Sequence, residues 1–130
     1  MVKRVFSSVF FAIAWTVALQ VLLCLPGSDL PSGGVFDIPN LDKAVHVFLF
    51  AGLTAVWCYY YYLKGKSPGR LAVIFFIVYL LSVADGIIME FVQRDYIPYR
   101  SFDTVDIIAD MLASSIAYGI CNIKLLKTTA

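Results

Sequence analysis

The chain has 130 residues, of which 61% are hydrophobic and 15% are charged, and its net charge is +1. A small soluble domain keeps a large share of its surface in water and cannot hide this much apolar surface. Disorder requires low hydrophobicity, and nucleic-acid binding requires a basic surface. The composition therefore argues against a soluble enzyme, a disordered chain and a nucleic-acid-binding protein, and it indicates an integral membrane protein.

Four apolar segments, at about 5–25, 44–63, 71–91 and 105–123, are separated by breaks that contain Pro and Gly. A membrane-spanning helix needs about 20 mostly apolar residues, and helices satisfy their own backbone polar groups in lipid. We therefore predict an all-α fold in which residues 1–130 form a single membrane domain, a bundle of four transmembrane helices. The first segment is interpreted as an uncleaved helix, because it is long for a signal peptide and no A-x-A cleavage site follows it.

Basic residues gather at the N-terminus, in the second break and at the C-terminus, as Lys3, Arg4, Lys64, Lys66, Arg70, Lys124 and Lys127. Lys and Arg are enriched in the cytoplasmic loops of membrane proteins. We therefore predict that both termini are cytoplasmic and that the first and third breaks face outward.

Unusual polar residues converge at the outward ends of the second, third and fourth helices. Ionisable groups near a membrane usually face a bundle interior or an aqueous cavity. Asp42 and His46 are four residues apart and share one helix face. Two interpretations of His46 follow: a structural histidine bonded to Asp42, or a catalytic or metal-binding one. Lys43 is expected to extend outward to the interface.

The third and fourth helices carry the remaining acids. Glu90 and Gln93 lie near the outward end of the third helix. Asp103, Asp106 and Asp110 form one stripe on the fourth helix, and Asp103 is either its N-cap or part of the site. Asp110 lies almost two turns into the helix and needs a partner.

Arg100 lies between the third and fourth helices, and we predict that it pairs with Glu90 or Asp106. The planar guanidinium can donate two hydrogen bonds to one carboxylate and offset the desolvation of both groups. The alternative interpretation is a network that only holds the helices together.

These residues, in this order, resemble the VanZ-like family of small bacterial membrane proteins. The resemblance covers about residues 40–120 and consists of Asp42-Lys43-Ala44-Val45-His46, Glu90-Phe91-Val92-Gln93, Pro98, Arg100, Asp106 and Asp110. The chain departs from the family pattern at Phe50, where tyrosine is common, at Asp110, where asparagine is common, and at Ala113, where glycine is common. The family's founding member is associated with low-level resistance to the glycopeptide teicoplanin.

The resemblance implies a multi-pass protein of the bacterial cytoplasmic membrane, but the family has no settled biochemical activity. Because the polar residues face outward above apolar walls, our first hypothesis is a protein that binds or modifies an extracytoplasmic envelope lipid or cell-wall precursor. We expect Asp42, His46, Glu90 and Asp106 to be catalytic, and Lys43, Gln93, Arg100 and Asp110 to bind the ligand. Alternatively, the clustered acids hold a divalent cation, since hard cations prefer oxygen ligands. Two other functions remain open, a structural or accessory subunit and an ion or proton carrier.

Overall fold

The computed structural model describes residues 8–26, 28 and 40–128, and this part of the chain forms four α-helices and no strand. The helices are α2 (Val9–Leu23), α3 (Leu41–Tyr62), α4 (Pro68–Tyr96) and α5 (Thr104–Cys121), and α5 continues into a short π-helix, η3 (Asn122–Leu126). The all-α fold is as predicted, and each helix overlaps its predicted segment, although residues 5–7 of the first segment lie outside the described residues.

The helix boundaries follow from local sequence signals. The side chain of Ser8 accepts a hydrogen bond from the amide of Phe10 and caps α2, while Asp103 accepts one from the amide of Val105 and caps α5. Pro68 occupies the first turn of α4, where its missing N–H leaves no helix bond unmade. The α4 helix runs to Tyr96, five residues beyond the predicted end. Its last turn lies beyond the apolar run and carries the charged residues Arg94 and Asp95.

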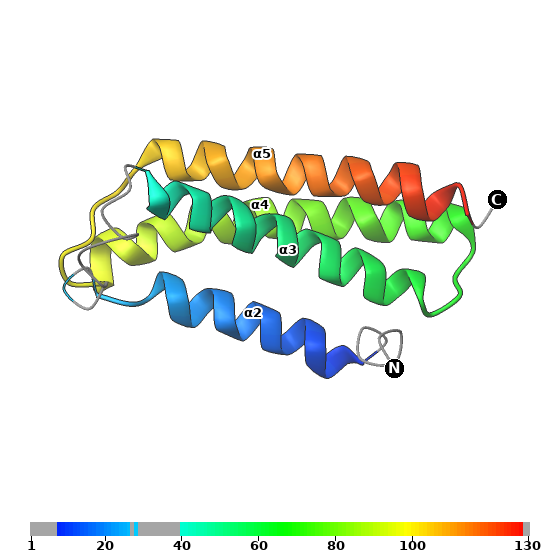
Figure 1. Cartoon of the computed structure of the whole chain (residues 1–130), viewed down its shortest axis with the longest axis horizontal. Coiled ribbons are helices and arrows are strands. Elements are labelled where there is room, and N and C mark those ends of the chain that lie inside the picture. The colour runs from blue at the N-terminus through cyan, green and yellow to red at the C-terminus, as the bar shows by residue number, and fades with distance from the viewer. Residues whose placement is uncertain (1–7, 27, 29–39, 129–130) are drawn as a thin grey trace.

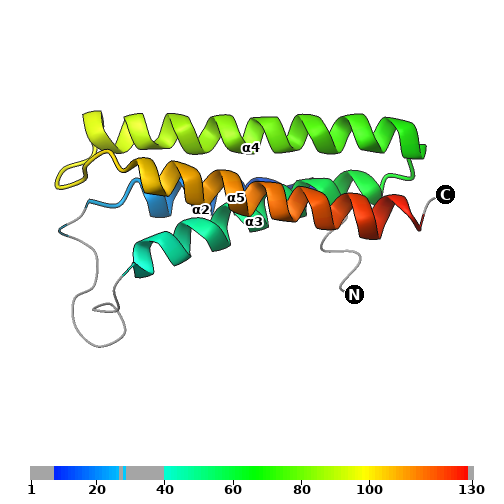
Figure 2. The ribbon, with the colours of Figure 1, turned by 90° about the horizontal axis from the view of Figure 1, so that it is seen from above.

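The bundle is built around α3 and α5, which make the most extensive contact in the molecule (Figure 1). The α4 helix packs against both of them, as the view from above also shows (Figure 2). The α2 helix lies on the outside, mainly against α3, and contacts α4 only slightly. Of the four α-helices, α2 thus makes the least contact with the others, although Leu19 and Leu23 are buried in the core.

Three of the helical segments are long and apolar enough to cross a membrane: Leu41–Tyr62, Pro68–Tyr96 and Thr104–Leu126. The α2 helix is apolar but shorter, with 15 residues. One face of α5 is apolar and exposed, and it consists of Val105, Ile108, Leu112, Ile116 and, in η3, Ile123. Ala113 and Ala117 on the opposite face are buried. The length and composition of these three helices are those of helices that could cross a membrane.

Candidate functional site

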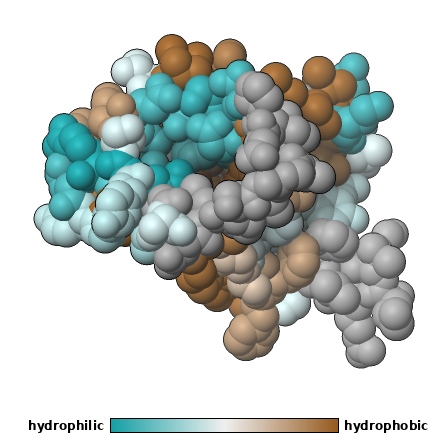
Figure 3. Space-filling view, turned by 60° about the vertical axis from the view of Figure 1, so that its left-hand side comes forward, coloured by the Kyte–Doolittle hydropathy of each residue, from teal (hydrophilic) through white to brown (hydrophobic). Residues whose placement is uncertain are grey.

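Four helix ends meet at one end of the bundle: the end of α2, the start of α3, the end of α4 and the start of α5 (Figure 1). Hydrophilic residues gather on the surface at this end (Figure 3). The charged groups that face one another here form the polar cluster, which consists of Lys43, His46, Glu90, Asp103, Asp106 and Asp110.

Lys43 joins α3 to α5 at the outer edge of the polar cluster. Its Nζ lies 2.7 Å from Oδ2 of Asp103, 3.1 Å from Oδ1 of Asp106 and 3.3 Å from Oδ2 of Asp42. The prediction that Lys43 extends outward is therefore wrong, because carboxylates on the neighbouring helix draw the ammonium group inward. The hydrogen bond from Lys43 also keeps the pKa of Asp103 below its ordinary value. Asp103 thus caps α5 and belongs to the cluster at the same time.

His46 and Asp110 form a buried pair between α3 and α5. Nδ1 of His46 lies 3.2 Å from each carboxylate oxygen of Asp110, and the two side chains are 3% and 1% exposed. The predicted partner of His46, Asp42, is exposed and contacts Lys43 instead. That pairing was wrong because the imidazole turns toward α5 rather than along its own helix. The same contact supplies the partner that Asp110 needs.

Glu90 brings a carboxylate from α4 into the polar cluster. Its side chain is completely buried, and Oε2 accepts a hydrogen bond of 2.9 Å from the backbone N–H of Asp103. The other oxygen, Oε1, is buried without a hydrogen-bond partner among the residues that the structure describes. A buried carboxylate oxygen without a donor is costly.

Three helices bring metal-ligating groups to one place. A ring nitrogen of His46, a carboxylate oxygen of Glu90 and one of Asp106 all lie within 4.8 Å of one another, and all three residues are buried. Five of the predicted site residues therefore meet: Lys43, His46, Glu90, Asp106 and Asp110. Asp42 touches this group only through Lys43.

Arg100 and Gln93, both predicted to bind the ligand, contact the end of α2. Arg100 donates from Nε to the backbone oxygen of Leu25 at 3.3 Å, and Gln93 donates from Nε2 to the backbone oxygen of Leu23 at 2.9 Å. The expected pairing of Arg100 with Glu90 or Asp106 was wrong: a backbone amide and Lys43 occupy those two acids. The free carbonyls at a helix end compete for such donors.

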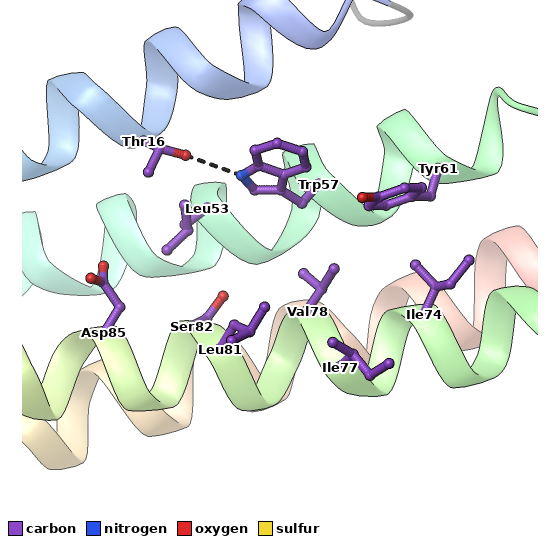
Figure 4. A pocket seen from close by; sticks show the side chains of 10 residues that line it. All are labelled: Thr16, Leu53, Trp57, Tyr61, Ile74, Ile77, Val78, Leu81, Ser82 and Asp85. Carbon is purple, nitrogen blue, oxygen red and sulfur yellow. Dashed lines mark hydrogen bonds between the residues drawn. The ribbon is translucent and has the colours of Figure 1, made fainter.

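A cavity of about 530 Å³ lies between α2, α3 and α4 (Figure 4). Its walls are mostly apolar, and it is lined by Thr16, Leu53, Trp57, Tyr61, Ile74, Ile77, Val78, Leu81, Ser82 and Asp85. Asp85 and Ser82 make one part of it polar. The residue after Asp85, Gly86, faces Asp110 of the polar cluster. The cavity and the polar cluster are therefore neighbours along α4.

Sequence reasoning missed the polar contacts of α2. Nε2 of Gln20 donates to both carboxylate oxygens of Asp85, at 2.8 and 2.9 Å, and Nε1 of Trp57 donates to Oγ1 of Thr16 at 3.0 Å. The signal was present, because an amide within an apolar run of this length requires a partner in the membrane.

The chain is 31% identical over 112 residues to an uncharacterized protein of the fission yeast Schizosaccharomyces pombe. The match covers 85% of the chain and 65% of the length of that relative. No family model matches the chain. No solved structure matches it either. The comparison with this relative therefore assigns no activity to the chain, and any functional conclusion rests on the geometry of the site.

Proposed function

We propose that this chain is a VanZ-like membrane protein that binds, or chemically modifies, an envelope lipid or lipid-linked wall precursor. A single observation carries the proposal: a buried cluster of acid, base and cation lies beside an apolar cavity within membrane-spanning helices. An amphipathic ligand needs such a pair of environments, since its head requires polar partners and its chain requires apolar walls.

The polar cluster offers acid–base chemistry to the head of such a ligand. Asp110 accepts from Nδ1 of His46, an arrangement that leaves Nε2 as the proton acceptor. Lys43 supplies positive charge at the edge of the cluster. A binding protein would use these groups to hold the head, and an enzyme would use His46 as its general base.

The orientation that we propose places both termini in the cytoplasm and the polar cluster on the outer side of a bacterial cytoplasmic membrane. The VanZ-like resemblance favours that membrane, although the relative found is fungal. The orientation is supported by basic residues at the opposite end from the cluster, namely Lys64 and Lys66 in the α3–α4 turn and Arg70 in the first turn of α4.

The first prediction compares Glu90→Gln with Asp95→Asn. Glu90→Gln keeps the size of a buried side chain but removes its charge, whereas Asp95 is 44% exposed and pairs with Arg94. Each variant is purified with its native lipids, and these are quantified by mass spectrometry. We expect the wild type and Asp95→Asn to retain one lipid enriched over the bulk membrane, and Glu90→Gln to lose that enrichment at an unchanged protein level.

Teicoplanin tolerance of cells expressing each variant provides the cellular readout, because the resemblance makes it the first drug to test. If enrichment is equal in all three proteins, or if Glu90→Gln loses protein in proportion to lipid, the proposed site is rejected. The second result would favour the alternative in which the polar cluster only holds the helices together. That alternative has its own support in the contacts of Lys43 with α5.

A further inference from the structure

We propose that the polar cluster holds one divalent transition-metal ion on His46, Glu90 and Asp106. This inference rests on the proposed function and adds a metal cofactor to the same site. The three ligands come from three different helices, α3, α4 and α5, and their ligand atoms lie within 4.8 Å of one another. Each side chain is buried, so water competes weakly for the ion.

The unpartnered oxygen of Glu90 points to a ligand that the protein itself does not supply. Glu90 is 0% exposed, and Oε1 has no hydrogen-bond partner among the described residues, while Oε2 is held by the amide of Asp103. One oxygen is thus fixed by the backbone and the other is available. This is the arrangement expected of a metal-binding carboxylate whose second oxygen is held in place.

His46 has the orientation of a metal ligand. Its Nδ1 faces both oxygens of Asp110 at 3.2 Å, so the proton belongs on that nitrogen and the lone pair on Nε2. Histidines that bind metals almost always donate their other N–H to a carboxylate or a carbonyl. Asp110 is therefore a positioning residue, which acts on the metal through the imidazole.

The charge of the polar cluster also requires a cation. Glu90, Asp106 and Asp110 are all buried carboxylates. Lys43 is the one lysine that contacts the described part of this cluster, and it is shared among Asp42, Asp103 and Asp106. Buried carboxylates are strongly disfavoured unless each is paired. A divalent ion between Glu90 and Asp106 would supply the missing positive charge.

The ligand set selects the class of metal. Calcium takes six to eight oxygen ligands, whereas one imidazole with two carboxylates suits zinc or manganese. Ligand atoms around a tetrahedral zinc ion are roughly 3.3 Å apart. The widest separation among the three ligand atoms therefore needs to shorten by about 1.5 Å at most. Three protein ligands leave a position open for water or for the head of a ligand.

The test measures metal binding by the full-length chain in detergent. The protein is stripped with a chelator, dialysed against Zn²⁺ or Mn²⁺ alone, and its metal content is measured by mass spectrometry. We expect about one ion per chain for the wild type and for the control Asp95→Asn. We expect affinity to fall roughly 10- to 100-fold in Asp110→Asn, and uptake to be lost in Glu90→Gln and His46→Gln.

The visible absorption spectrum of the wild type loaded with Co²⁺ is a second measurement, and it needs no variant. Three protein ligands and one further ligand should give the spectrum of tetrahedral Co²⁺. The inference is overturned by a wild-type content below about 0.1 ion per chain, or by equal uptake in Glu90→Gln. If no metal binds but Glu90→Gln still loses the enriched lipid, the metal is rejected and the proposed function stands. If metal binds and the lipid is unaffected, the metal stands and the proposed function is rejected.

Discussion

At the scale of single residues, Gly86 sets how closely α4 approaches α5. A Cβ at this position would lie 3.1 Å from both Cβ and Oδ2 of Asp110, and 3.4 Å from Cε1 of Phe50. Asp110 in turn holds His46. The absence of a side chain at position 86 therefore leaves the space in which the buried pair forms.

Gly86→Ala should consequently push Asp110 away from His46 and strain the contact between α4 and α5. Overpacking of this kind destabilises proteins by about 1–3 kcal/mol. The measurement is the free energy of unfolding in mixed detergents, with Gly119→Ala on α5 as the control because nothing lies within 4 Å of a Cβ there. Equal stability of the two variants would show that the helices are not closely packed at Gly86.

The sequence predicts which residues form the polar cluster better than it predicts which of them pair with one another. Arg100 was expected to pair with an acid, yet Lys43 does so, because the α3 helix places the ammonium group opposite the first turn of α5. Spacing along one helix shows which residues share a face, as Asp106 and Asp110 do. It does not show which helix packs against that face. The sequence therefore did not predict that His46 contacts Asp110 rather than Asp42.

At the scale of elements, the helices themselves were predictable because their length and apolar runs determine them. The α5 stripe is the clearest case, with Ala113 buried and Ile116 exposed. The position of α2 was not predictable, since its apolar surface shows almost no amphipathic pattern. Polar contacts place it instead: Nε1 of Trp15 donates to the backbone oxygen of Leu49 at 3.1 Å, and Gln20 binds Asp85.

A loosely packed α2 explains why a cavity persists between it and α4. We predict that Ile77→Trp fills this cavity and reduces the binding of a lipid with a photoreactive acyl chain. Ile77 lines the cavity and is 49% exposed, so the larger side chain can be accommodated without disturbing the core. The control is Val73→Trp, one turn away on α4, 60% exposed and not part of the lining. Equal crosslinking in both variants would place the lipid chain elsewhere.

At the scale of the whole molecule, the two ends of the bundle differ in the charges they carry. The polar end holds several acids around Lys43, with Arg94 paired to Asp95. The opposite end has Lys64 over the ring of Tyr60, at 4.9 Å from its centroid, in a run of aromatic residues. Aromatic residues are enriched at both interfaces of a membrane, whereas lysines are enriched on the cytoplasmic side. This asymmetry is what supports the proposed orientation.

The orientation can be measured with two single cysteines in a chain whose native Cys24, Cys58 and Cys121 are replaced by alanine. All three native cysteines are free, so no disulfide is lost. Ser101 lies at the polar end and Ser67 at the basic end, and both are exposed. Ser101→Cys should react with a membrane-impermeant maleimide in intact cells, whereas Ser67→Cys should react only after permeabilisation. Reversed labelling would place the polar cluster on the cytoplasmic side, where an extracytoplasmic ligand could not reach it.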